Sequence, residues 1–147
     1  MTILITGGMG KTGSQLVHLL DTAKIPFVIA SQSGSAPAPF EGVKFDWFDK
    51  SIYRNPFDAH SDINKVYLIF PSASDPTPIT KSFIDFAISK GMKCFVLLSA
   101  SALEKGGNRV SKAHEHLVKS GVDYVVLHLT WFIGANAISL LISISKY

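Results

Sequence analysis

A glycine-rich turn between an apolar run and an amphipathic segment is the feature that most constrains this chain. Residues 3–5 (Ile-Leu-Ile) lead into Thr6–Gly13 (Thr-Gly-Gly-Met-Gly-Lys-Thr-Gly), and apolar residues then recur at helical spacing over residues 16–23. A strand, a glycine turn and a helix in this order place backbone N–H groups at a helix N-terminus, where they and the helix dipole favour a phosphate. We therefore predict an anion-binding turn over residues 7–13.

The glycines of this turn, Gly7, Gly10 and Gly13, follow one another at intervals of three residues. In dinucleotide-binding turns one glycine permits a tight bend, one lets the pyrophosphate approach the backbone, and one lets the helix pack on the strand. The usual spacing is G-x-G-x-x-G, and G-x-x-G-x-x-G is the variant of the short-chain dehydrogenases. A plain strand-to-helix turn can carry the same glycines, so the motif alone leaves both interpretations open.

The same stretch partly matches a P-loop, because Gly10-Lys11-Thr12 has the sequence that ends that motif. The first glycine of a P-loop would fall at position 5, which is Ile5. A P-loop enzyme also needs an apolar strand that ends in Asp to hold magnesium, whereas the runs 66–70 and 94–98 are followed by Pro71 and Ser99. These departures favour the dinucleotide interpretation.

Apolar runs and helical repeats alternate along the chain. We predict strands over residues 2–6, 26–30, 43–46, 65–70, 94–99 and 124–129, and helices over 11–23, 51–61 (weak and interrupted by Pro56), 79–90 and 110–120. Continuous apolar strands that alternate with helices are typical of an α/β domain with a parallel sheet covered on both faces. We predict a Rossmann-type, doubly wound parallel sheet over residues 1–132, and a divergent tail over 133–147 that has neither helical nor strand spacing.

Charge and cysteine content narrow the classes of partner. The 147 residues carry a net charge of +3 and show no Lys/Arg cluster, which disfavours nucleic-acid binding. No run approaches the roughly 20 apolar residues of a membrane helix, and no cleavable leader is visible. The single cysteine, Cys94, allows no disulfide within the chain, which is typical of a reducing compartment. We expect a cytoplasmic protein that binds neither nucleic acid nor a membrane.

The expected cofactor follows from what stands after the second strand. Ligands of such sheets bind at the carboxyl ends of the strands, where the strand order reverses. Ser31, Gln32 and Ser33 occupy the position where an Asp or Glu would bind the ribose hydroxyls of NAD. Small polar side chains leave room for a 2′-phosphate, which Lys11 could neutralise, so the loop favours NADPH. An ordinary solvated loop is the alternative.

Further residues are expected along the same edge of the sheet. Asp46 follows the third strand and can accept a hydrogen bond from an adenine amino group, and Trp47 either stacks on the base or packs in the core. Pro71 and Ser72, together with residues 99–101, should approach the nicotinamide half. The predicted cofactor-binding residues are Gly7, Gly8, Gly10, Lys11, Thr12, Gly13, Ser31, Gln32, Ser33, Asp46, Pro71 and Ser99.

The sequence assigns no catalytic residue and no metal ligand. Short-chain dehydrogenases often use Tyr-x-x-x-Lys, but no tyrosine here has a lysine four residues on, and Tyr124 is followed by His128. Lys112 follows the fifth strand and is either such a lysine or a surface lysine. The histidines of residues 114–116 (His-Glu-His) lie two residues apart, which places them on different faces of a helix, so we predict no shared metal ion.

Several separated segments share their residues with one enzyme family. They are residues 2–4 with 7–12, 24–27, 45–47, 95–101, 104–107 and 130–132. Together, and in this order, they resemble the agroclavine dehydrogenase and festuclavine synthase family of ergot alkaloid biosynthesis, a group of NmrA-like, atypical short-chain dehydrogenases. The resemblance runs from Thr2 to Phe132.

The resemblance implies an NADPH-dependent reduction of an iminium carbon in a tetracyclic ergoline. The small-molecule partner would be an alkaloid precursor, chanoclavine-I aldehyde, which closes to the iminium. An iminium already carries positive charge, so hydride attack needs no strong proton donor, and catalysis would consist mainly of positioning. That chemistry suits a chain without the Tyr-x-x-x-Lys pair.

Two departures from the family shape what we expect of this chain. His128-Leu129 stands where the family has Arg-Pro, and beyond Phe132 the family continues through segments that cover the substrate. The resemblance therefore implies the cofactor half of a longer enzyme, truncated at its C-terminus, in which dinucleotide binding survives better than turnover. The alternatives are a non-catalytic NmrA-like sensor or regulator that binds NADP, and a remnant without a stable fold.

Overall fold

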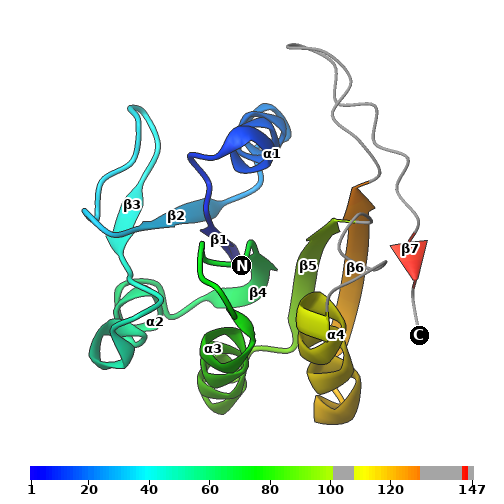
Figure 1. The fold of residues 1–147 in the computed structure, drawn as a ribbon. Coiled ribbons are helices and arrows are strands. Elements are labelled where there is room, and N and C mark those ends of the chain that lie inside the picture. Colours follow the sequence, from blue (N-terminus) through cyan, green and yellow to red (C-terminus); the bar gives the residue numbers. More distant parts are fainter. Residues whose placement is uncertain (101–107, 130–143, 146–147) are drawn as a thin grey trace.

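The computed structural model describes residues 1–100, 108–129 and 144–145, which form a sheet with helices on both faces (Figure 1). In chain order the elements are β1 (Thr2–Thr6), α1 (Lys11–Thr22), β2 (Phe27–Ser31), β3 (Gly42–Lys44), the 3₁₀ turn η1 (Lys50–Ile52), α2 (Asn55–Ala59), β4 (Ile63–Leu68), α3 (Thr77–Ser89), β5 (Cys94–Ala100), α4 (Asn108–Ser120), β6 (Asp123–Leu129) and β7 (Ile144–Ser145).

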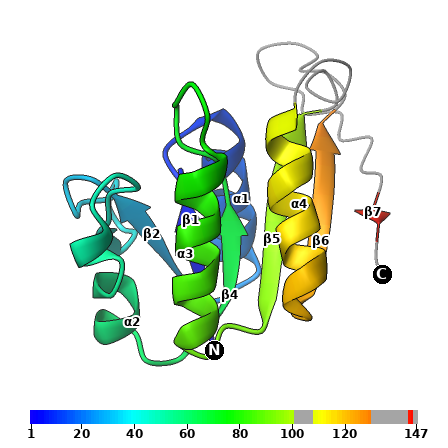
Figure 2. The same cartoon turned by 60° about the horizontal axis from the view of Figure 1, so that its bottom comes forward.

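The sheet has the order β3-β2-β1-β4-β5-β6-β7. Strands β1 to β6 run parallel, and the short β7 pairs antiparallel with β6. The chain builds outward from β1 to β3 and then returns to the other side of β1 with β4, so the strand order reverses between β1 and β4. Helix α1 covers one face, and α2, α3 and α4 cover the other (Figure 2). The predicted Rossmann-type, doubly wound sheet is confirmed.

The central strands carry apolar side chains on both faces because each divides its side chains between two cores. On β4, Val66 and Leu68 join the core beneath α2, α3 and α4, whereas Tyr67 joins the core beneath α1. Leu4 and Ile5 of β1 divide in the same way, and both are fully buried. Strands sandwiched between two helical layers must be apolar on both sides, which is why these runs show no alternation.

Several element boundaries differ from the sequence predictions, and prolines account for two of them. Pro56 does not interrupt a helix; it lies in the first turn of α2, where a missing N–H leaves no hydrogen bond unmade. Pro78 lies in the first turn of α3 for the same reason, so that helix begins at Thr77 rather than at residue 79. Strand β2 extends to Ser31, and β4 spans 63–68 rather than 65–70.

The predicted C-terminal ends of α3 and α4, on the face of the sheet opposite α1, are confirmed. Helix α3 ends at Ser89 and is followed by Gly91 with φ +89°, and α4 ends at Ser120 before Gly121 with φ +69°. Glycine adopts this left-handed conformation without strain, so it commonly stops a helix.

The predicted boundary between residues 132 and 133 lies outside the described residues, as does most of the predicted tail. Within that tail, Ile144 and Ser145 form β7 opposite Leu127 and Val126. Among the residues that the structure describes, no helix is long and apolar enough to cross a membrane.

Candidate functional site

The glycine turn closes directly after β1. Gly7 has φ +70°, and the Gly10 N–H donates a hydrogen bond to the Gly7 carbonyl oxygen at 3.0 Å. A Cβ atom on Gly7 would lie 3.2 Å from Cβ of Ile69, in the segment that follows β4. The turn therefore sits at the point where the strand order reverses, which is the ligand-binding position in sheets of this kind.

Helix α1 follows with an open N-terminus. Gly10 is its N-cap and supplies no capping side chain, and the first turn contains no acidic residue. The N–H groups of Lys11, Thr12 and Gly13 begin the helix and have no acceptor within it. Together with the helix dipole, these groups attract an anion.

Two of the glycines allow backbone segments to approach closely. A Cβ at Gly13 would lie 2.2 Å from the Gly7 carbonyl oxygen and 2.7 Å from Cα of Gly8. A Cβ at Gly8 would lie 2.9 Å from Cγ2 of Ile29. A side chain at Gly13 would push the turn away from the helix, and one at Gly8 would press on the Ile29 side chain of β2. Gly13 in particular maintains the close backbone approach that a diphosphate requires. The residues present fit such a group.

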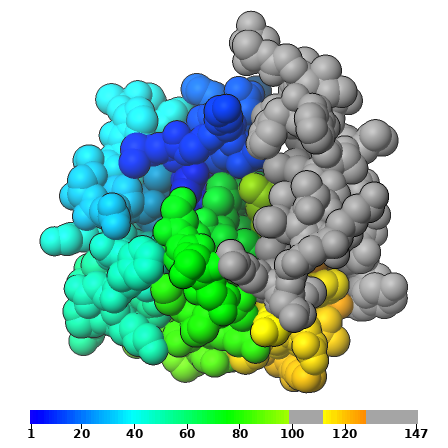
Figure 3. Space-filling view, viewed as in Figure 1, coloured from blue at the N-terminus to red at the C-terminus, as the bar shows by residue number. Residues whose placement is uncertain are grey.

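A groove of about 620 Å³ opens beside the turn, within the usual size of small-molecule sites. Figure 3 shows this face, where the blue residues around the turn, the cyan and teal segments and the green β4–α3 connection meet. The groove is lined by Thr6, Gly7, Met9, Ala30, Ser31, Gln32, Ser33, Phe45, Trp47, Phe48, Ile69, Phe70, Pro71 and Ser72.

The structure brings part of the predicted set to the groove and places the rest around it. Gly7, Ser31, Gln32, Ser33 and Pro71 line it directly. The predicted residues Gly8, Gly10, Lys11, Thr12 and Gly13 form the turn and the start of α1 without being part of the lining. Ser99 lies near the end of β5, opposite His128 of β6, and its side chain lies outside the described part of the chain. Their role in cofactor binding stays a prediction.

The loop after β2 is held by its own serines. The Ser31 hydroxyl donates to the Ser35 carbonyl oxygen at 2.7 Å, and the Ser33 and Ser35 hydroxyl oxygens are 2.7 Å apart. The Ser35 N–H also donates to the Ser33 hydroxyl at 3.2 Å. No carboxylate stands between residues 31 and 40, so this wall of the groove is polar but uncharged.

Asp46 is not one of the lining residues, but it is hydrogen-bonded to two residues that are. Its Oδ2 accepts a hydrogen bond from Nε2 of Gln32 at 3.1 Å, and its Oδ1 accepts one from the Phe48 N–H at 2.9 Å. Both donors belong to residues that line the groove. Asp46 thus links the loop after β2 to the loop after β3.

The aromatic wall of the groove was only partly predicted. Trp47 packs edge-on against Phe45 and Phe83, each at 5.2 Å between ring centroids, and it also lines the groove. Its stacking on the base stays a prediction. Phe48 and Met9 also line the groove, and both are more than half exposed. Large apolar side chains directly after a strand end or inside a glycine turn are the sequence signal that could have identified them.

The sequence alone also did not predict that the side chain of Thr6, the last residue of β1, forms hydrogen bonds to β4 and to the segment after it. It is 1% exposed, and its hydroxyl accepts the Ile69 N–H at 2.9 Å. The same hydroxyl lies 3.1 Å from the Tyr67 carbonyl oxygen, to which it can donate. Thr6 therefore joins the ends of β1 and β4 at the switch point and fixes the backbone that carries Ile69 and Phe70 into the groove.

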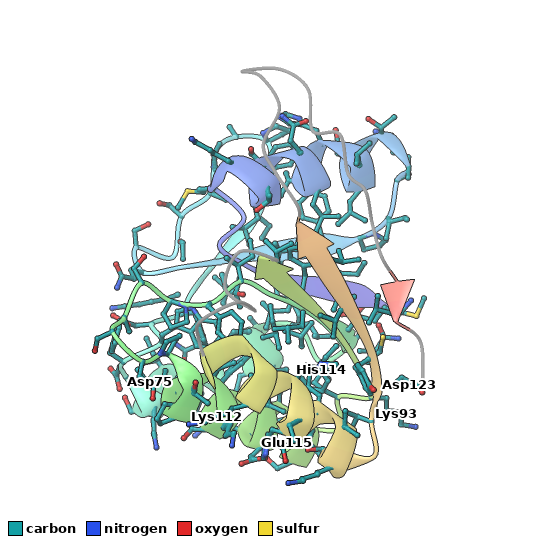
Figure 4. All side chains as sticks on the ribbon, turned by 45° about the vertical axis from the view of Figure 1, so that its right-hand side comes forward. Asp75, Lys93, Lys112, His114, Glu115 and Asp123 are labelled. Carbon is teal, nitrogen blue, oxygen red and sulfur yellow. The ribbon has the colours of Figure 1, made fainter. Side chains whose placement is uncertain are left out.

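No titratable side chain lines the groove in the part of the chain that the structure describes. Lys112 is exposed on α4 and is not one of the lining residues (Figure 4). Cys94 begins β5, away from the carboxyl ends of the strands, and burial raises the pKa of its thiol. These two groups therefore offer no acid, base or nucleophile at the described site.

The histidines of α4 are separated as predicted. The His114 ring packs against Tyr124 of β6 at 5.4 Å, whereas Nε2 of His116 lies 2.6 Å from Oδ1 of Asp85 on α3. Figure 4 shows His114 toward the strands and Glu115 on the outer side of the helix, where it pairs with Lys119. Among the described residues, no group of His, Cys, Asp and Glu could hold a metal ion.

Solved structures with the same fold are enzymes that share little sequence with this chain. A nucleoside-diphosphate-sugar epimerase from Staphylococcus aureus matches with a TM-score of 0.75 at 16% identity, over 90% of this chain and 51% of the epimerase. An NADPH-dependent quinone oxidoreductase from Escherichia coli, solved with NADPH, matches with a TM-score of 0.70 at 20% identity, over 88% of this chain and 49% of that enzyme. At these identities the matches support the fold alone.

Comparison with known sequences identifies relatives at higher identity than the comparison of folds. No family model matches the chain. A festuclavine synthase from Penicillium roqueforti is 44% identical over 138 residues, which are 90% of this chain and 48% of the synthase. An agroclavine dehydrogenase from Claviceps fusiformis is 42% identical over 136 residues, or 90% of this chain and 47% of the enzyme.

A festuclavine dehydrogenase from Aspergillus fumigatus is 41% identical over 90% of this chain and 48% of its own length. The chain thus spans about half the length of the curated relatives that it matches. Over that half, the chain is a homologue of the festuclavine synthases and agroclavine dehydrogenases, as its motifs predicted.

Proposed function

We propose that this chain binds NADPH in the groove and forms the cofactor-binding part of a reductase that acts on an ergoline iminium. The observation that carries the proposal is the glycine turn, where a Cβ at Gly13 would lie 2.2 Å from the Gly7 carbonyl oxygen beside the open start of α1. The turn opens onto a groove of about 620 Å³ in a homologue of agroclavine and festuclavine dehydrogenases.

Each part of the groove suits a different part of the dinucleotide. The N–H groups of Lys11, Thr12 and Gly13 would hold the diphosphate. The uncharged loop with Ser31 and Ser33 would accommodate the phosphorylated adenosine ribose, since no carboxylate of that loop opposes the phosphate. Residues at the carboxyl end of β4 would face the nicotinamide half.

The uncharged lining suits hydride transfer to an iminium. When bound, NADPH would supply a hydride to the iminium carbon and become NADP⁺, and the iminium nitrogen would take up the electron pair of the C=N bond. The product is a neutral amine, and no proton is added at carbon or nitrogen. A groove without a titratable side chain in its described lining can therefore serve this reaction by positioning the reactants and excluding water.

Binding and turnover test the two parts of the proposal separately. We expect titration calorimetry with the 147-residue chain to show a single NADPH site. Gly10→Ala places a methyl group at the N-cap of α1, 3.3 Å from the Gly7 carbonyl oxygen, and should weaken binding at least tenfold, because the methyl crowds the turn beside the amides that face the phosphates. Gly91→Ala is the control for a methyl group added far from the groove: at φ +89° it should lower stability, but it should leave the affinity for NADPH unchanged. Equal affinity of the two variants would contradict the assignment of the turn.

Turnover is measured as the loss of NADPH absorbance when the cyclised iminium of chanoclavine-I aldehyde is added. The absence of a titratable group from the described lining also favours a second candidate, a sensor that binds NADPH without turning it over. NADPH oxidation that depends on the iminium supports the reductase. Tight binding without oxidation, when this chain is joined to the remaining half of a festuclavine synthase, supports the sensor.

A further inference from the structure

We propose that Asp46 is a positioning residue that limits how strongly the groove prefers a 2′-phosphorylated dinucleotide over an unphosphorylated one, and that it acts through Gln32. The inference rests on the proposed function, because it concerns which nicotinamide dinucleotide the groove takes. It also differs from the role that the sequence suggested for Asp46, a direct hydrogen bond to adenine.

Asp46 is hydrogen-bonded to two residues that line the groove, one in the loop after β2 and one in the loop after β3. It is half-buried and is not part of the lining, whereas Gln32 and Phe48 both line the groove. Gln32 donates from Nε2 to Oδ2 of Asp46 at 3.1 Å, and the Phe48 N–H donates to Oδ1 at 2.9 Å. Each oxygen of the carboxylate is thus held by one of the two loops.

The chemistry of this contact decides which way the Gln32 amide faces. An ionised carboxylate only accepts hydrogen bonds, so Gln32 must turn its NH₂ group toward Asp46. The amide oxygen is then the end of the side chain that Asp46 does not hold. A carbonyl oxygen accepts a hydrogen bond from a ribose hydroxyl but cannot donate one to a phosphate.

Charge acts in the same direction as the hydrogen bond. Asp46 is one side chain away from the groove wall, and its carboxylate would repel a 2′-phosphate on the ribose. The exposed Lys44 lies next to the same loop, because a Cβ at Gly34 would lie 3.2 Å from Cβ of Lys44. Asp49 is also close, but its Oδ1 accepts hydrogen bonds from the N–H and the hydroxyl of Ser51 in η1. Asp46, in contrast, is a carboxylate that is hydrogen-bonded to a groove-lining side chain.

Asp46→Asn tests the proposal with little change in shape. The introduced amide can still accept the Phe48 N–H through its oxygen, while its NH₂ group lets the Gln32 amide turn and present its own NH₂ to the ligand. We expect the dissociation constant for NADPH to fall about tenfold, the scale of one hydrogen bond from the Gln32 amide to a charged phosphate, and that for NADH to stay within about twofold. Adenosine 2′,5′-bisphosphate and adenosine 5′-monophosphate should show the same contrast, because they contain the adenosine end alone.

Asp58→Asn is the matched control for net charge. Asp58 is exposed on α2, pairs with Arg54 and does not line the groove, so its replacement should leave both dissociation constants unchanged. Gln32→Leu tests the route, because without the amide the gain from Asp46→Asn should shrink by more than half. Unfolding temperatures of all variants show whether the fold is retained.

The outcomes separate this inference from the proposed function. A wild-type chain that binds neither dinucleotide contradicts both. A wild-type chain that binds them, with an Asp46→Asn variant whose ratio of the two dissociation constants is unchanged, overturns the inference alone. An equal gain in the presence and absence of Gln32 also overturns it, since Asp46 would then act by charge without positioning Gln32.

Discussion

At the scale of single residues, Gly13 shows how tightly the turn is built. It lies in the first turn of α1, where alanine would ordinarily be about 1 kcal/mol more favourable than glycine. A Cβ there, however, would lie 2.2 Å from the Gly7 carbonyl oxygen, which is backbone and cannot turn aside as a side chain can. The close approach of two backbone segments therefore outweighs helix propensity at this position.

Gly13→Ala should for this reason destabilise the protein, by about 1–3 kcal/mol in urea denaturation. The change should also remove NADPH binding, because the turn must move away from the start of α1. Ala23→Gly, at the C-cap of the same helix, offers a comparison where glycine and alanine differ without any backbone clash. An unfolding free energy equal to or above that of the wild type would show that the turn has room for a side chain.

Thr6 contributes a hydroxyl that three backbone groups share. Replacing it with valine keeps the shape but leaves the buried Ile69 N–H without its acceptor. We expect Thr6→Val to lower the free energy of unfolding by about 1–3 kcal/mol and to weaken NADPH binding, since Ile69 and Phe70 line the groove. Thr6→Ser retains the hydroxyl and should recover most of the binding. Valine and serine variants with the same affinity would contradict this role.

At the scale of elements, α3 is attached to the sheet by an aromatic cluster. Phe83 is fully buried, and its ring lies 4.9 Å from that of Phe45, 5.2 Å from Trp47 and 5.3 Å from Tyr53. The Tyr53 hydroxyl donates to the Trp47 carbonyl oxygen at 2.6 Å, and burial raises its pKa. The helix thereby supports the aromatic wall of the groove from below.

Phe83→Ala should cost about 3–5 kcal/mol of stability, because it leaves a cavity among rigid rings. Val118→Ala on α4 removes a side chain that is 51% exposed and should change stability by less than about 0.5 kcal/mol. Chemical denaturation of both variants gives the comparison. Similar unfolding free energies would show that the aromatic cluster adds little to the attachment of α3.

The order and type of the elements could be predicted because the signals are local. Apolar runs mark strands buried on both faces, and Gly91 and Gly121 mark helix ends, all within a few residues of chain. Pro56 and Pro78 were misjudged, since a proline that opens a helix and one that breaks it look alike until the helix start is known.

Of the candidate site, the parts that depend on local sequence could be predicted, and the contacts between distant segments could not. The glycine turn and the loop with Ser31 and Ser33 follow from motif and position alone. The hydrogen bonds by which Thr6 joins β1 to β4 cannot be predicted in this way, because the partners Tyr67 and Ile69 lie 61 and 63 residues away in the chain. The link between Asp46 and Gln32 likewise depends on how two loops are placed by β2 and β3.

At the scale of the whole molecule, the strand order explains why distant segments form one groove. Strands β2 and β4 flank β1 on its two sides, so the segments after all three strands meet at one edge of the sheet. The described groove draws its lining from those segments and from the residues after β3. The chain spans about half the length of the curated relatives that it matches, and in the enzyme that we propose this half would bind the cofactor.

The central claim is that this groove holds a nicotinamide dinucleotide, and thermal unfolding of the 147-residue chain with NADPH, NADH or ATP tests it most directly. A ligand raises the unfolding temperature only if the folded state binds it, and the increase grows with the logarithm of its concentration. The account predicts a concentration-dependent increase with NADPH, a smaller one with NADH and none with ATP. An increase with ATP alone, or no increase with either dinucleotide, would contradict it.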